Sequence, residues 1–115
     1  MNKLTDFFES DKNIWGESNV YCKLFIYSPN SKECQLEPVL TGTYKTSEDL
    51  IKDIDTLSID RELKDFIITN LNNKEISSIL YQCPKRGISE IAGSLQLKKD
   101  DIIVELFAKY DIFYT

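Results

Sequence analysis

Histidine is absent from this chain of 115 residues. Its absence excludes Ser-His-Asp and Cys-His catalytic arrangements, the usual protease zinc sites and imidazole acid-base chemistry near neutral pH. Glycine is scarce, with four residues, and neither G-x-x-x-x-G-K-[ST] nor G-x-G-x-x-G occurs, so nothing indicates a phosphate-binding loop. No catalytic motif remains. We therefore expect a protein that is not an enzyme and needs no cofactor.

Cysteine is limited to Cys22, Cys34 and Cys83, at long and irregular spacings without a CxxC pair. A zinc site would need all three, gathered from separate elements, with a carboxylate as the fourth ligand. Reduced and mostly buried thiols are the favoured interpretation. We predict no metal site.

Long apolar runs are also missing. The longest covers only Leu24 to Tyr27, whereas a membrane helix needs roughly 20 apolar residues. The first residues show no basic stretch followed by an apolar one, so we expect no secretory signal and a cytoplasmic location. A chain of this length, 42% apolar and 29% charged, is typical of a single folded domain over residues 1–115.

Hydrophobic periodicity predicts an α+β domain that is mostly helical. Leu4, Phe7 and Phe8 indicate a short N-terminal helix that ends near Asp11. Bulky and β-branched residues over about 20–27, with side chains of this kind on both faces, indicate a strand. A second strand within 34–44 would complete a β-hairpin packed on helices, and Pro38 and Gly42 favour an edge position or a bulge.

Three central helices are predicted next. Ser47 can cap the first, whose buried stripe would be Leu50, Ile51, Ile54 and Leu57. The second begins at Asp60, buries Leu63, Phe66, Ile67 and Leu71, and ends at Asn72-Asn73. The third is indicated by the spacing of Ile76, Ile79, Leu80 and Cys83, and Pro84 would end it.

The C-terminal segment supports two interpretations. Residues 102–114 alternate in hydrophobicity as a strand does, yet several of the same residues also form one helical stripe. Residues 88–107 resemble a helix-turn-helix: Ser89 would cap the first helix, Ala92, Leu95 and Leu97 would pack inward, residues 98–101 would form the turn, and Ile102 and Leu106 would anchor the second helix. We favour this helix-turn-helix-like pair over a hairpin.

Negative charge is concentrated in one segment. Residues 46–65 carry seven acids and three bases, net −4, whereas residues 1–45 have net −1 and residues 66–115 net 0. Acids near helix starts are a common feature of solvated helix surfaces, because the helix dipole favours them there. An acidic surface can also bind a basic partner.

We predict a small acidic protein-binding domain that masks a basic surface of a partner, as an immunity protein or another inhibitor of a nucleic-acid enzyme such as a nuclease does. The candidate partner-binding residues are Glu48, Asp49, Asp53, Asp55, Asp60 and Glu62. The analogy with inhibitors rests on size, acidity and aromatic content, because no motif marks such a family.

Two alternatives stay open. The helix-turn-helix resemblance implies a transcriptional regulator that binds DNA through residues 98–109, although Asp100, Asp101 and Glu105 would repel phosphates there. The second alternative is a small-ligand-binding domain with a pocket between the hairpin and the helices. The sequence does not give the oligomeric state.

Overall fold

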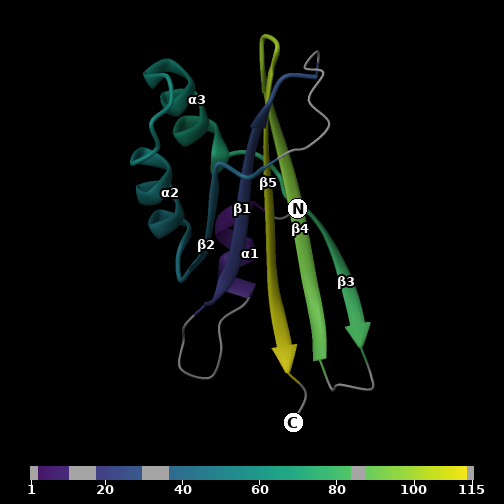
Figure 1. The fold of residues 1–115 in the computed structure, drawn as a ribbon. Coiled ribbons are helices and arrows are strands. Elements are labelled where there is room, and N and C mark those ends of the chain that lie inside the picture. The colour runs from purple at the N-terminus through teal and green to yellow at the C-terminus, as the bar shows by residue number, and fades with distance from the viewer. Residues whose placement is uncertain (1–2, 11–17, 30–36, 84–87, 114–115) are drawn as a thin grey trace.

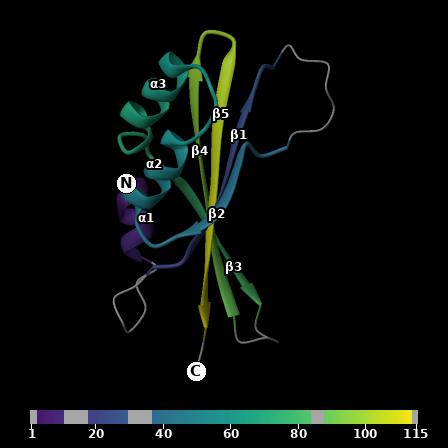
Figure 2. The same cartoon turned by 60° about the vertical axis from the view of Figure 1, so that its left-hand side comes forward.

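The computed structural model describes residues 3–10, 18–29, 37–83 and 88–113, and for 79–83, 88–89 and 111–113 it describes the backbone course only. The elements follow in the order α1 (Leu4–Ser10), β1 (Val20–Tyr27), β2 (Leu40–Tyr44), α2 (Ser47–Asp55), α3 (Arg61–Leu71), β3 (Ser77–Cys83), β4 (Ile88–Lys99) and β5 (Ile102–Phe113). The strands form one five-stranded sheet in the order β2-β1-β5-β4-β3, and every neighbouring pair is antiparallel. The helices lie on one side of this sheet (Figures 1 and 2).

The prediction of a mostly helical domain is wrong, because the sheet is the larger part of the described molecule. The third central helix does not form: residues 77–83 are strand β3, paired along their length with β4. Ile76, the first residue of the expected helical stripe, is buried just before the strand. The helical spacing there was coincidental, since hydrogen bonding to β4 satisfies the backbone in an extended form.

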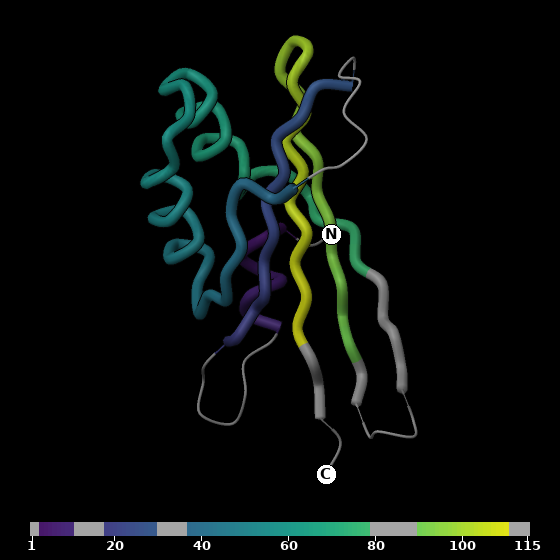
Figure 3. The backbone as a smooth tube through the Cα atoms, viewed as in Figure 1, coloured from purple at the N-terminus to yellow at the C-terminus, as the bar shows by residue number. Residues whose placement is uncertain are grey.

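The helix-turn-helix-like pair is also wrong. Strands β4 and β5, of 12 residues each, form a long antiparallel hairpin (Figure 3). Asp100 takes a positive φ of 54° in the two-residue turn, a conformation that Asp tolerates and that matches the twist of a hairpin. β5 is the central strand, so both of its edges are hydrogen-bonded, and its β-branched and aromatic residues suit that position.

Several local predictions are confirmed. The N-terminal helix buries Leu4, Phe7 and Phe8, and β1 and β2 pair as an antiparallel hairpin with β2 at the edge of the sheet. The part of the second strand predicted at 34–36 lies outside the described residues. The cap of α2 is Thr46 rather than Ser47: its hydroxyl accepts a hydrogen bond from the backbone N–H of Asp49 at 3.1 Å, and Ser47 is buried.

The hydrophobic core lies between the helices and one face of the sheet. Paired residues at the centre of that face are Leu24, Leu106 and Leu95, from β1, β5 and β4. Leu50, Ile54, Leu63, Ile67 and Leu71 cover them from α2 and α3, so the stripes predicted for these two helices are buried at these positions.

Helix α1 packs closely on the sheet at Gly93. A Cβ at this position would lie 2.9 Å from Phe7 Cε2 and 2.9 Å from Ile76 Cδ1, closer than such atoms normally approach. The ring of Phe7 also meets Tyr110 edge to face, with centroids 5.0 Å apart. Glycine at 93 therefore sets the distance between α1 and the sheet.

Candidate functional site

The predicted partner-binding acids lie on α2, on α3 and at the residue before α3. We call Glu48, Asp49, Asp53, Asp55, Asp60 and Glu62 the acidic helix patch. All six are exposed. Leu50 and Ile54 turn the opposite side of α2 toward the core, which leaves its acids in solvent.

Local structure explains four of these acids. Glu48 and Asp49 occupy the first turn of α2, Glu62 the first turn of α3, and Asp60 the N-cap of α3. Carboxylates at helix starts interact favourably with the helix dipole. Their positions are therefore accounted for by helix stability alone, although they remain available to a partner.

The other two acids lie where the helix dipole disfavours them, in the last turn of α2. Asp53 Oδ2 accepts a hydrogen bond from the hydroxyl of Tyr44 at 2.7 Å, which fixes β2 to α2. It also lies one turn after Asp49, and two like charges at this spacing destabilise a helix by a few tenths of a kcal/mol. Asp55 ends the helix, and no contact of its carboxylate explains it in the described structure. These two acids are the part of the patch that helix stability does not explain.

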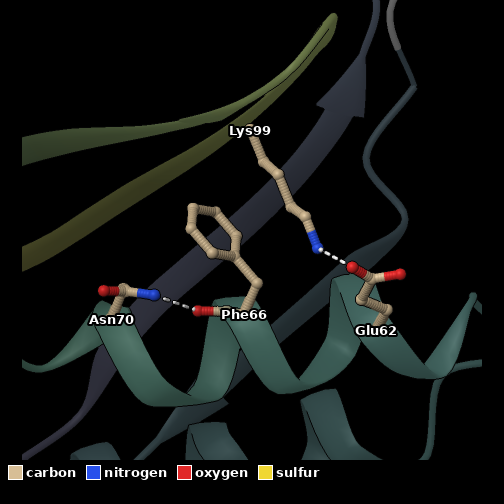
Figure 4. A network of polar contacts seen from close by, with 4 residues as sticks. All are labelled: Glu62, Phe66, Asn70 and Lys99. Carbon is tan, nitrogen blue, oxygen red and sulfur yellow. Dashed lines mark hydrogen bonds and ion pairs between the residues drawn. The ribbon is translucent and has the colours of Figure 1, made fainter.

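Glu62 also takes part in a contact between the helices and the sheet. Its Oε1 lies 3.1 Å from Lys99 Nζ, and the Lys99 ammonium lies 5.6 Å from the centroid of the Phe66 ring (Figure 4). The side chain of Glu62 remains 80% exposed, so this ion pair contributes little stability and leaves the carboxylate accessible. The contact links the end of the β4–β5 hairpin to α3.

The opposite side of the sheet carries a second surface, which the sequence analysis did not identify as a site. We call it the open face, because the helices cover the other side (Figure 2). Its described residues on the three middle strands are Tyr21, Lys23, Phe25 and Tyr27 of β1, Ile103, Glu105, Phe107 and Lys109 of β5, and Glu90, Ala92, Ser94, Gln96 and Lys98 of β4. The bulk on both faces of residues 20–27 was the signal for it. Residues 103, 107 and 109 lie on the open face only because β5 is a strand, in which alternate side chains point to the same side.

The open face departs from the usual pattern of a one-sided sheet, in which outward positions are polar. Phe25 and Phe107 are diagonal neighbours on β1 and β5, and Tyr27 lies opposite Ile103. These four side chains are only partly buried. Together they make an apolar cluster that no described helix covers.

Charged and polar groups surround this cluster. Lys23 Nζ and Lys109 Nζ lie 5.7 and 5.6 Å from the centroid of the Tyr21 ring, and Lys109 Nζ is 3.7 Å from Glu90 Oε2. The Tyr27 hydroxyl donates to Glu105 Oε2 at 3.3 Å and accepts from Gln96 Nε2 at 3.4 Å.

The buried titratable groups lie at the covered side of the sheet rather than in either surface. Burial raises the pKa of the Cys22 thiol to about 12. Burial, with the hydrogen bond to Asp53, raises the pKa of Tyr44 well above its usual range. A thiol held protonated in this way is a poor nucleophile and a poor metal ligand.

Among the described residues, no three His, Cys, Asp or Glu side chains are grouped so that they could hold a metal ion. In the same part of the chain, no helix is long and apolar enough to cross a membrane. Cys34 lies outside the described residues, and Cys83 is described only in its backbone.

Comparison with known proteins adds no assignment: no protein-family model, curated protein or solved structure matches this chain.

Proposed function

We propose that this chain is a small protein-binding domain that masks a basic surface of a partner protein with its acidic helix patch. The observation that supports this most directly is the pair Asp53 and Asp55, two exposed acids at the end of α2 where the helix dipole disfavours negative charge. The mode of action would be that of an immunity protein or another inhibitor, with a nucleic-acid enzyme such as a nuclease as one kind of partner.

The mechanism is steric and electrostatic occlusion. Carboxylates of the patch pair with Lys and Arg side chains that the partner would otherwise use to bind phosphates. A net charge of −4 over residues 46–65 attracts a basic surface before contact and speeds association. Because α2 and α3 are held on a sheet, the patch needs no rearrangement to bind.

The test compares two variants that lose the same charge. The triple variant D49N/D53N/D55N removes three carboxylates from the patch, and Asn at 53 can still accept the Tyr44 hydrogen bond. The control variant E37Q/D100N/D101N removes three exposed carboxylates elsewhere. The tagged parent protein is used to capture partners from lysate of the source cells, and bound protein and nucleic acid are both analysed after elution with salt.

The affinity of each variant for the purified basic partner is then measured at low and high salt. We expect the triple variant to associate more slowly, with a weaker dependence on salt, while the control variant binds as the parent does. If both variants lose the same affinity for the partner, the effect is due to the net charge of the chain and not to the acidic helix patch. Unchanged affinity of the triple variant at low salt would refute the proposal.

The DNA-reading alternative loses its structural basis, because residues 98–109 form the turn and strand of a hairpin and supply no recognition helix. No contact of the described residues favours the small-ligand alternative.

A further inference from the structure

We propose that the open face binds single-stranded nucleic acid, with bases stacked on the rings of its apolar cluster and phosphates held by Lys23, Lys98 and Lys109. This inference is independent of the acidic helix patch, which lies on the helical side of the sheet (Figure 2). It also differs from DNA reading by a helix, since the binding surface is a sheet.

The first argument is the arrangement of the rings. Phe25, Tyr27 and Phe107 lie on the adjacent strands β1 and β5, near the middle of the sheet, and are partly exposed. Side chains on neighbouring strands are roughly 5 Å apart and successive ones on a face roughly 7 Å apart, so several bases can lie on the surface at once. Aromatic side chains on a sheet are a common stacking surface for unpaired bases.

The second argument is where the positive charge lies. On the three middle strands, Lys23, Lys98 and Lys109 lie on the open face together with Glu90, Glu105 and, by its register position opposite Glu90, Asp111. These strands are therefore neutral on this side, in a chain whose total is −5. Lys23 and Lys109 are beside Tyr21 at one end of the apolar cluster, and Lys98 lies opposite Ile103 at the other. Lys109 is also paired with Glu90 at 3.7 Å, whereas no carboxylate of the described residues forms an ion pair with Lys23, so a phosphate near Tyr21 would be attracted chiefly by Lys23 and secondarily by Lys109.

The third argument comes from the polar groups between the rings. Glu105 and Gln96 are cross-strand neighbours and are linked through the Tyr27 hydroxyl. A carboxylate accepts hydrogen bonds from the amino groups of bases, and an amide can both donate and accept. Glu105 would repel a phosphate, so its place beside the rings fits contact with base edges.

Protein-protein contact is the less favoured occupant. The centres of protein interfaces are depleted of Lys and Glu, whereas here Lys23 lies between Tyr21 and Phe25 on β1, and Glu105 and Lys109 flank Phe107 on β5. Aromatic rings interleaved with lysines are the combination expected of a surface for single strands.

The experiment measures fluorescence anisotropy of labelled 12-nucleotide single strands of mixed sequence, as DNA and as RNA, with the full chain at low salt. We expect saturable binding that weakens with salt, and weaker binding of the matching duplex. K23Q/K109Q should reduce the slope of log affinity against log salt by about 1.4, at about 0.7 per lost phosphate contact. F107L, which keeps an apolar side chain, should weaken binding about tenfold through lost stacking.

The matched control is K52Q/K74Q, which removes two exposed lysines away from the open face and should bind as the parent does. D49N/D53N/D55N should also keep binding, which separates this inference from the proposed function. Thermal unfolding of each variant checks that it is folded. Absence of an anisotropy change would overturn the proposal, as would parental binding by both open-face variants. Sedimentation that shows a dimer disrupted by F107L, without oligonucleotide binding, would assign the face to a second copy instead.

Discussion

The two sides of the sheet carry similar apolar side chains that differ in burial. On the covered side, Leu24, Leu95 and Leu106 are almost completely buried against α2 and α3. On the open face, Phe25 and Phe107, each next to one of these leucines in the chain, remain partly exposed. Since the strands are the same, the difference shows that the placement of the helices, rather than hydrophobicity alone, decides which side is the core.

The largest expected effect sharpens this comparison with two adjacent residues. Leu106→Ala should lower the free energy of unfolding by about 2–5 kcal/mol, because it leaves a cavity in the centre of the core. Phe107→Ala, on the open face, should lower it by only about 1 kcal/mol, through lost cross-strand contacts. Urea unfolding of both variants checks this. Equal losses would mean that the open face is packed as tightly as the core.

A smaller effect is expected at Gly93, where α1 approaches the sheet. Gly93→Val should lower the free energy of unfolding by about 1–3 kcal/mol, because Phe7 and Ile76 must move aside. Ser94→Val introduces the same side chain at the next residue, which is exposed on the open face, and should leave stability nearly unchanged. Thermal unfolding of the pair is the measurement. A destabilised Ser94→Val would break the comparison between the two sides.

Alkaline pH should lower the stability of the fold through Cys22 and Tyr44, which lie on the covered side of the sheet. Cys22 ionises near pH 9.0 when unfolded but at about 12 when folded, and Tyr44, ordinarily 10.0, is shifted upward as well. Their contribution to stability is therefore complete below about pH 9 and is lost as the pH rises from there toward and beyond 12. The free energy of unfolding should fall over this range and fall less steeply in C22A/Y44F, measured by denaturant titration at several pH values. Parallel curves would contradict the assignment.

The smallest effect concerns the link between the helices and the hairpin end. A double-mutant cycle of Glu62→Gln and Lys99→Gln should give a coupling of about 0.5 kcal/mol that decreases with added salt, since Glu62 is largely exposed. Urea unfolding at two salt concentrations measures it. A coupling of several kcal/mol would show that Glu62 is a structural residue rather than an accessible member of the acidic helix patch.

The comparison also explains which predictions from sequence failed. Helices α1, α2 and α3 were predictable because their apolar spacing is local and only one periodicity fits it. At residues 76–83 and 88–107 the spacing of apolar residues fits a helical stripe, but these segments form strands β3, β4 and β5 in the structure. Local spacing alone could not distinguish the helical periodicity from that of a strand. The acids of the patch were selected from the charge of residues 46–65, and their binding of a partner stays a prediction. Phe107 and Lys109 could be assigned to the open face only once β5 was known to be a strand.

The sequence by itself determined the short helices, the β1–β2 hairpin, the segregation of negative charge into residues 46–65 and the absence of histidine chemistry. These properties depend on neighbours in the chain and on composition. The tertiary structure alone decided that β5 lies between β1 and β4, and with it the existence of the open face. The physical reason is that a strand acquires its hydrogen bonds from segments distant in sequence, so its pairing, and the side of the sheet that the helices leave uncovered, are set by packing of the whole chain.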